Sequence, residues 1–371
     1  MRRLFYKVGV CMVLLAFSAA GCRAAAAAPD PLIIQAQKAV QKGIGYLHRV
    51  QEKDGSWSHY PGTTALALAA LLRNGHNELN DPAVARGIHY LLHLVKPNGG
   101  IYDDRDPNLA LPNYNTSLSM MALYLTHNPA YKPIIAKAQK FLEDSQFGAT
   151  DGMKPSNPFY GGIGYGSDPD DHPDLSNLAT ALEALKDTGV PADAPVWKRA
   201  IIFLQRVQNR KESNDQAWAK TGPNDGGFVY DPLGGSKSPQ GYRTSYGSMT
   251  YEGLKSYIYC NVSRQDPRAQ AAWNWIRAHY SVTTNPGMGT AALYYYYHTM
   301  AKTLAVYGQK YVVDTHGKPH YWQKDLIRQL IRLQHPDGSW FNTNARFWEN
   351  QPALVTSYTL IALAYCLHPN S

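Results

Sequence analysis

The sequence has few cysteines, no dense block of basic residues, and no apolar run at its start that is long enough to span a membrane. Four of the 371 residues are cysteine, and two of these fall within the first 22 residues, which leaves Cys260 and Cys366. Their spacing fits neither a disulfide framework nor a zinc cluster. Lysine and arginine are scattered along the chain, which argues against nucleic acid as a partner. The apolar run 8–17 is shorter than a transmembrane helix requires.

Residues 1–22 have the order of an export signal. Three basic residues come first, followed by the apolar run and then by small residues. The stretch Ala19-Ala20-Gly21-Cys22 resembles a bacterial lipoprotein box with Cys22 as the lipidated residue, although Ala19 stands where leucine is usual. An ordinary signal cleaved within Ala24–Ala28 is the alternative. We expect an exported protein of the periplasm or outer cell envelope, anchored to the membrane through Cys22.

The export route and the mature charge follow from the same segment. Residues 2–7 read Arg-Arg-Leu-Phe-Tyr-Lys and resemble a twin-arginine signal, with a plain basic start as the alternative. The formal net charge is +8, and loss of three basic residues with no acid before Cys22 gives 8 − 3 = +5. We divide the chain into a signal at 1–22, a linker at 23–30 and a single domain at 31–371.

That domain repeats one pattern six times: an amphipathic helix, a glycine-rich loop and a more apolar helix that opens with small or hydroxyl residues. In the first unit, apolar residues recur at helical spacing over 31–51, and residues 63–72 are apolar on every side. A hairpin of this kind cannot bury its apolar helix alone, so neighbours must stack. We therefore predict an all-α fold, an α/α toroid of about six hairpins closed into an α6/α6 barrel. An open solenoid is the alternative.

Two stretches near the ends of the domain share a motif. Residues 51–57 read Gln-Glu-Lys-Asp-Gly-Ser-Trp, and residues 334–340 read Gln-His-Pro-Asp-Gly-Ser-Trp. Both resemble the QW repeat of squalene-hopene and oxidosqualene cyclases. The Gly-Gly loops at 99–101 and 226–228 are similar to those of protein prenyltransferase β subunits, which share the toroid. We expect the motif to fasten hairpins together rather than to catalyse, through Gln51, Gly55, Trp57, Gln334, Gly338 and Trp340.

The resemblance to squalene-hopene cyclases implies an Asp-x-Asp-Asp acid that protonates an alkene, which requires an unusually strong general acid. Residues 168–171 read Asp-Pro-Asp-Asp, but the place that leads directly into the inner helix reads Asp174-Leu175-Ser176-Asn177. This departure argues against hopene-type cyclisation. Candidate catalytic carboxylates are Asp174, with helix capping as its alternative role, and Glu252, with a hydrogen-bonded core position as its alternative. Asp170 and Asp171 are further candidates, which we expect in a solvated loop.

Prenyltransferases bind zinc through aspartate, cysteine and histidine at the ends of inner helices. Cys260 lacks the surrounding Asp-x-Cys pattern and His298 is isolated, so we expect no metal and no cofactor. A ligand site should lie at the N-termini of the inner helices, whose positive ends favour anions. Four consecutive tyrosines at 294–297 cover every face of a helix, so at least half of them should only pack. The expected cavity residues are Asn115, Ser176, Asn177, Tyr246, Tyr251, Tyr294, Tyr295 and His298.

Three functions are consistent with these features. The first is a toroid with a central aromatic cavity that binds an isoprenoid or another small apolar ligand, as a terpene cyclase or prenyl transferase would. The second is a polysaccharide-active (α/α)6 enzyme, which paired carboxylates such as Asp174 and Glu252 across the mouth would favour. The third is a non-catalytic interaction scaffold, which a cavity filled by its own side chains would favour. The sequence leaves open whether the chain is catalytic and how it oligomerises.

Overall fold

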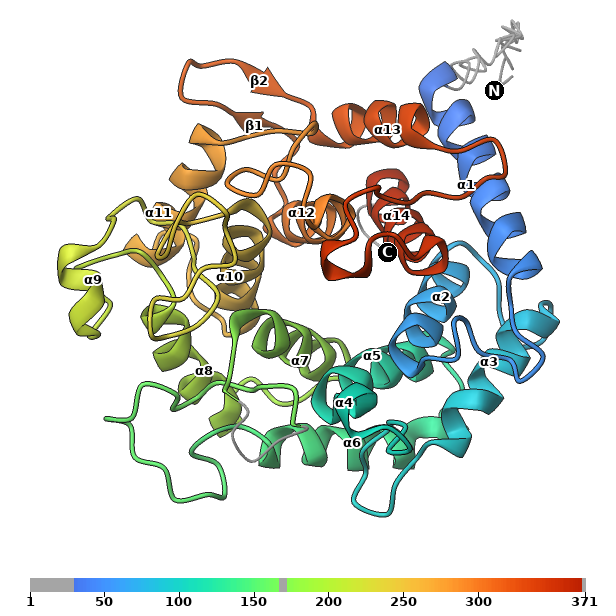
Figure 1. Ribbon diagram of the computed structural model, residues 1–371, viewed down its shortest axis with the longest axis horizontal. Coiled ribbons are helices and arrows are strands. Elements are labelled where there is room, and N and C mark those ends of the chain that lie inside the picture. The colour runs from blue at the N-terminus through green and yellow to red at the C-terminus, as the bar shows by residue number, and fades with distance from the viewer. Residues whose placement is uncertain (1–29, 167–171, 369–371) are drawn as a thin grey trace, which may run out of the picture.

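The computed structural model describes residues 30–166 and 172–368. The predictions about Cys22, Asp170 and Asp171 lie outside these residues. The described chain consists mainly of helices arranged in two concentric rings (Figure 1). The inner ring contains α2 (Pro61–Arg73), α5 (Pro112–Leu125), α7 (Leu175–Asp187), α10 (Gly247–Tyr259), α12 (Leu293–Tyr307) and α14 (Pro352–Leu367). The outer ring contains α1 (Pro31–Arg49), α3 (Pro82–His93), α6 (Lys132–Asp144), α8 (Pro195–Arg206), α11 (Pro267–Ala278) and α13 (Trp322–Leu333).

Short elements decorate the loops that join the rings. They are α4 (Pro107–Ala110), α9 (Ala217–Thr221), the 3-10 turns η1 (Pro129–Tyr131) and η2 (Arg346–Trp348), and the strands β1 (Val312–Val313) and β2 (Pro319–His320). The strands form an antiparallel hairpin in which Val312 pairs with His320. The repeat pattern did not predict this hairpin, which lies between α12 and α13 at the outer rim (Figure 1).

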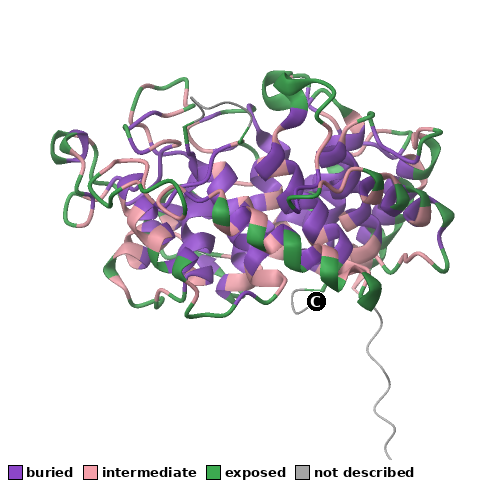
Figure 2. Ribbon diagram, turned by 90° about the horizontal axis from the view of Figure 1, so that it is seen from below, coloured by how far each residue is buried: buried purple, intermediate pink, exposed green. Residues whose placement is uncertain are grey.

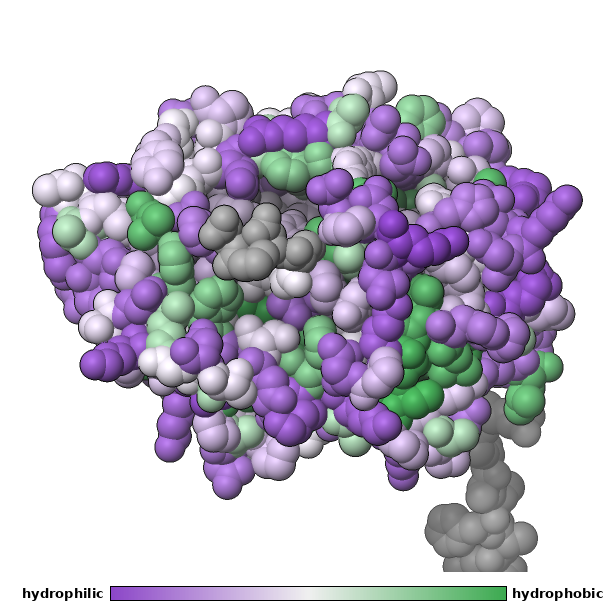
Figure 3. Space-filling view, turned by 60° about the horizontal axis from the view of Figure 1, so that its bottom comes forward, coloured by the Kyte–Doolittle hydropathy of each residue, from purple (hydrophilic) through white to green (hydrophobic). Residues whose placement is uncertain are grey.

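The two rings differ in burial, as their residue patterns require. Outer helices bury one face, whereas α14 is buried continuously from Ala353 to Cys366, and purple inner helices contrast with mixed outer ones in Figure 2. Several outer helices begin with an aspartate cap followed by proline, as at α1, where Asp30 Oδ1 accepts a hydrogen bond from the Leu32 amide at 3.0 Å. The face shown in Figure 3 is largely hydrophilic, with smaller groups of hydrophobic residues between.

The Gln-to-Trp motif connects one hairpin to the next. The Gln51 side-chain amide donates to the carbonyls of Gly55 (2.9 Å) and Ala83 (2.8 Å), and so reaches the outer helix of the second unit. The indole of Trp57 is buried and donates to the Leu47 carbonyl at 2.8 Å. Gly55 has φ +89°, and a Cβ there would lie 2.5 Å from the Arg86 carbonyl oxygen. Glycine is therefore required both by the backbone conformation and by the close approach.

The same amide bridge recurs at Gln146, Gln208 and Gln334. Gln146 donates to the Val196 carbonyl at 3.0 Å, and Gln208 donates to the Arg268 carbonyl at 2.9 Å. Gln334 donates to the Ala39 carbonyl at 2.9 Å, which joins the sixth unit to the first. Helix α14 packs against both α12 and α2, so the ring is closed (Figure 1). The predicted α/α toroid is therefore confirmed.

Within the described residues, none of the helices is long and apolar enough to cross a membrane. Cys260 and Cys366 are both buried and carry free thiols. Burial raises the pKa of the Cys260 thiol to about 12, so this residue stays a neutral packing group at neutral pH.

Candidate ligand cavity

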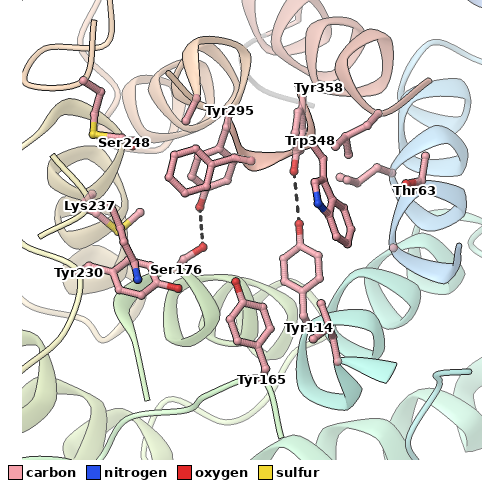
Figure 4. Close-up of a pocket in the computed structure, with 18 of the residues that line it drawn as sticks. Thr63, Tyr114, Tyr165, Ser176, Tyr230, Lys237, Ser248, Tyr295, Trp348 and Tyr358 are labelled. Atoms are coloured by element: carbon pink, nitrogen blue, oxygen red, sulfur yellow. Dashed lines mark hydrogen bonds between the residues drawn. The ribbon is translucent and has the colours of Figure 1, made fainter. Parts of the chain in front are cut away.

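A cavity of about 390 Å³ opens at the N-terminal ends of the six inner helices. Ring closure places these ends around one axis, and small residues such as Gly62 and Ser176 at the helix starts leave the space between them open. Nine aromatic side chains from the helix starts and neighbouring loops surround that space (Figure 4). They are Tyr60, Tyr114, Tyr165, Tyr230, Tyr246, Tyr295, Phe347, Trp348 and Tyr358.

The walls of this aromatic cavity are nearly free of charge. Among its described lining residues, the one with a formal charge is Lys237, which is exposed at the rim with its ammonium 4.4 Å from the ring centre of Tyr230. Burial raises the pKa of both Tyr114 and Tyr165 to about 12. The phenols are therefore neutral at physiological pH and present apolar rings with a few hydroxyl groups.

A layer of three tyrosines forms the floor of the aromatic cavity. The hydroxyl groups of Tyr114 and Tyr358 lie 3.3 Å apart, and the Tyr295 hydroxyl lies 3.1 Å from Ser176 Oγ (Figure 4). The Tyr295 and Tyr358 rings meet edge to face at 5.8 Å. Each of the three tyrosines also lines a second, much smaller space of about 40 Å³ beneath the layer. The layer therefore separates two environments.

Below the tyrosine layer lies a buried ionic cluster made by Glu183, Glu252, Lys255 and Lys302. The Lys255 ammonium is 2.7 Å from a carboxylate oxygen of Glu183 and 2.7 Å from one of Glu252. Lys302 forms an ion pair with the other oxygen of Glu183. Buried charges are tolerated when they are paired in this way. Glu252, a predicted catalytic carboxylate, is thus ion-paired, and it accepts a hydrogen bond from the Tyr295 hydroxyl at 3.3 Å.

Asp174 caps α7. Its carboxylate accepts the Asn177 backbone amide at 2.9 Å and the Asn177 side-chain amide at 2.6 Å. This is the capping role that the sequence offered as the alternative for Asp174. The Asn177 side chain is held by the same carboxylate and does not line the aromatic cavity. Asp174 borders a separate pocket of about 340 Å³, which shares Tyr165 and Tyr230 with the aromatic cavity. Of the stretch aligned with the cyclase acid, the residue that faces the aromatic cavity is Ser176.

The other predicted cavity residues divide between lining and packing. Ser176, Tyr246 and Tyr295 line the aromatic cavity, and His298 lines the small space below it. Among the four consecutive tyrosines, Tyr295 is the one that reaches a cavity. We expected Asn115, Tyr251 and Tyr294 to line the cavity as well, but the structure places them in packing positions. Asn115 is buried at the start of α5 and donates to the Ala110 carbonyl at 2.7 Å, Tyr251 packs on Tyr296 with ring centres 5.6 Å apart, and Tyr294 packs on Tyr297 at 5.7 Å.

Glu349 caps an inner helix that opens at the aromatic cavity, a role that the sequence did not reveal. It precedes α14, yet its carboxylate accepts the backbone amides of Leu293 (2.9 Å), Tyr294 (2.8 Å) and Tyr295 (2.8 Å) at the start of α12. Asn342 donates to it as well, at 2.7 Å. Burial raises the pKa of the Glu349 carboxyl, and these four donors oppose the rise. The chain itself thus fills the positive end of α12, where a ligand anion could otherwise bind.

Comparisons with known proteins agree with this architecture. No known family profile matches the sequence. One curated relative, drimenyl diphosphate synthase from Streptantibioticus cattleyicolor, is 36% identical over 79 residues, which make up 20% of this chain and 14% of that protein. The match therefore spans a small part of the relative's length.

Solved structures match over nearly the whole chain. The type II terpene cyclase MstE from Scytonema, in complex with geranylgeranyl dihydroxybenzoate, matches with TM-score 0.56 at 11% identity, covering 91% of this chain and 99% of that one. A glycosidase in complex with glucose matches with TM-score 0.50 at 12% identity, covering 91% and 98%. At such identities the likeness concerns the fold. By fold, the chain is an α/α toroid, the architecture that these cyclase and glycosidase structures share.

Proposed function

We propose that this chain is an exported protein whose aromatic cavity binds a neutral isoprenoid or another small apolar ligand. The observation that carries the proposal is the aromatic cavity itself, with nine aromatic walls and no carboxylate among the described lining residues. Its volume of about 390 Å³ falls within the range of about 300–1,000 Å³ in which small-molecule sites occur. Burial of an apolar chain against such walls is favourable by the hydrophobic effect.

The electrostatics of the site favour a ligand without an anionic head group. Glu349 already accepts the free amides of α12, and Asp174 does the same at α7. A diphosphate would meet these carboxylates at the helix ends and be repelled. The Scytonema cyclase was solved with a geranylgeranyl compound, which supports an isoprenoid-like ligand in a toroid of this fold.

The alternatives have less support. A polysaccharide-active enzyme needs two carboxylates facing one cleft, but Asp174 borders the adjoining pocket and Glu252 lies below the tyrosine layer. A scaffold without a ligand would have its cavity filled by side chains, and the aromatic cavity is open. Protonation of an alkene by the aligned acid is disfavoured because Ser176 takes the cavity-facing position.

Ligand titration tests the proposal directly. Trp348 stands at the mouth, half exposed, and makes an edge-to-face contact with Tyr60 at 5.7 Å, so its fluorescence should report occupancy. We expect all-trans-farnesol or geranylgeraniol to change this fluorescence saturably, and native mass spectrometry to show one bound molecule. A cello-oligosaccharide should do neither. Binding of the oligosaccharide instead of the isoprenoids, or of none of them, would refute the proposal.

A pair of substitutions localises the binding. Ser176→Phe projects a ring into the aromatic cavity, whereas Ser263→Phe adds the same ring at an exposed position between α10 and α11. We expect Ser176→Phe to weaken farnesol binding by at least about tenfold, equivalent to about 1.4 kcal/mol. Ser263→Phe should leave it unchanged. Equal effects of the two would place the ligand outside the cavity.

Export and lipid anchoring are part of the proposal and have a separate test. The composition of residues 1–22 supports export, and the box that ends in Cys22 supports lipidation. Expression of the full chain in a bacterium followed by fractionation should find it in membranes, and Cys22→Ala should release it. Recovery of both forms in the soluble periplasmic fraction, with a mature N-terminus within residues 24–29, would favour the ordinary signal instead.

A further inference from the structure

A histidine and aspartate cluster lies on the outer side of the ring, away from the aromatic cavity. Its members are His48 near the end of α1, His76 in the turn after α2, and Asp81 at the N-cap of α3. One potential ligand atom from each residue lies within 4.8 Å of the others. The cluster therefore joins three segments of the first two units at a single point.

The three groups converge on one carboxylate oxygen. Asp81 Oδ2 lies 2.8 Å from His48 Nε2 and 2.7 Å from His76 Nδ1. The two imidazole rings stand at 73° to each other, with centres 5.6 Å apart, so the two nitrogens approach the Asp81 oxygen from different directions. The other oxygen of Asp81 accepts a hydrogen bond from the Ala83 amide at 2.9 Å. This bond holds the carboxylate in one orientation, as hydrogen bonds to metal ligands commonly do.

We propose that His48, His76 and Asp81 bind a divalent transition metal ion such as zinc. Two imidazole nitrogens and one carboxylate oxygen form a ligand set that zinc accepts, with water or another ligand in a fourth position. The side chain of Asp81 is 6% exposed, whereas those of His48 and His76 are 36% and 26% exposed. The anion is thus buried at the bottom of the site, and the outer side is open to the solvent that would bring the ion.

The geometry requires a small adjustment. Bonds of about 2.0–2.2 Å in a tetrahedron separate neighbouring ligand atoms by roughly 3.3 Å, and the nitrogen–oxygen distances here are 2.8 and 2.7 Å. Each imidazole nitrogen must therefore move away from the Asp81 oxygen by roughly 0.5 Å as the ion enters. Both are partly exposed, so this movement does not disturb the core. Metal binding requires each imidazole nitrogen that faces Asp81 to present its lone pair, so the proton of a neutral ring moves to the other nitrogen of the same ring.

The location assigns the metal a structural role. Three residues further on, the Gln51 amide binds the Ala83 carbonyl between the same two units at 2.8 Å. A metal at Asp81 would add a second and stronger connection between α1 and α3, which are neighbours on the right of the ring (Figure 1). Ligand atoms from different segments, brought together only by folding, make metal affinity part of the folding free energy.

Isothermal titration of the purified, chelator-treated protein with zinc chloride tests the site. We expect one ion per chain and a raised melting temperature. Magnesium chloride, whose ion prefers oxygen ligands, should produce none of these effects. His48→Ala and His76→Ala should each weaken zinc binding at least tenfold, whereas His93→Ala, from the exposed His89–His93 pair on α3, should not.

A conservative variant separates metal binding from folding. His76→Gln can still donate a hydrogen bond to Asp81 but offers a poor ligand for zinc, so we expect a folded protein by circular dichroism with weakened binding. The proposal is overturned if the wild-type protein binds no zinc above the His48→Ala background. It is equally overturned if His76→Gln binds zinc as tightly as the wild type, because the ion would then lie elsewhere.

Discussion

The side-chain amide of Gln334 lies 2.9 Å from the carbonyl oxygen of Ala39, although the two residues are 295 positions apart. This hydrogen bond is the counterpart of the one from Gln51 to Ala83, which connects two consecutive units. The sixth unit is therefore joined to the first by the same contact that joins the first unit to the second. Arg49 reinforces the junction by donating to the Asp337 carbonyl at 2.6 Å.

Removal of the Gln334 amide should destabilise the closed ring. We expect Gln334→Ala to lower the free energy of unfolding by about 1–3 kcal/mol, because the carbonyls of Ala39 and Gly338 lose a buried donor. Urea denaturation measures the loss. Gln51→Ala should cost a similar amount, and Gln216→Ala, whose amide bonds at the surface, should cost almost nothing. Equal stability of Gln334→Ala and Gln216→Ala would contradict the role assigned to the motif.

Substitution of the motif glycine by alanine should destabilise the protein more than the same substitution at an ordinary glycine with positive φ. Gly338 (φ +91°) approaches the Lys42 carbonyl, whereas Gly75 (φ +90°) has nothing within 4 Å of the position of an added Cβ. Both Gly→Ala changes carry the backbone strain of about 1–2 kcal/mol, but Gly338→Ala adds a clash with the backbone. We expect it to cost about 1–3 kcal/mol more in unfolding free energy than Gly75→Ala. A smaller loss at Gly338 would show that the hairpins can separate freely.

Disruption of the buried ionic cluster should be costly. Lys255 bridges Glu183 and Glu252, so Lys255→Met leaves a buried carboxylate without its partner. We expect a loss of about 3–5 kcal/mol, measured by chemical denaturation. Lys140→Met, which breaks the exposed pair with Asp144 on α6, should cost about 0.3–0.5 kcal/mol. Comparable losses would mean that the cluster is hydrated in the folded protein.

His298 should make stability depend on pH. Burial, together with the nearby charges of Lys255 and Arg73, lowers the pKa of this imidazole to about 3, and its Nδ1 has no hydrogen-bond partner among the described residues. The unfolded chain binds a proton near pH 6.5, and the folded chain does so only near pH 3. Stability therefore falls as the pH is lowered through this window, by about 1.4 kcal/mol per pH unit.

The variant His298→Gln isolates this contribution from that of the acidic residues. We expect the difference in unfolding free energy between the wild type and the variant to change by about 1.2 kcal/mol between pH 6 and pH 5. Urea denaturation at the two pH values measures it. A difference that does not vary with pH would show that His298 is accessible to protons in the folded state.

The sequence predicted the toroid well because its signals are local and repeated. Amphipathic outer helices, apolar inner helices and the motif beginning at Gln51 each indicate how one hairpin meets the next, and closure follows from repetition. The hairpin of β1 and β2 was missed because it falls in a loop that occurs once.

The site was predicted only in outline. Ser176, Tyr246 and Tyr295 line the aromatic cavity because they stand at or near the starts of inner helices. The role of Glu349 depends on a loop that folds back onto α12, which no spacing reveals. The ionic cluster did leave a signal, since Glu183 and Lys255 interrupt otherwise apolar inner helices and a buried charge requires a partner.

The tyrosine layer imposes a limit on length. A ligand that enters from the mouth can extend only until it reaches the hydroxyl contact between Tyr114 and Tyr358, which is 3.3 Å long. Any further atom must part these rings and approach paired charges that cannot solvate a hydrocarbon. For the isoprenoid ligand proposed above, the layer would therefore select by the length of the chain rather than by its functional groups.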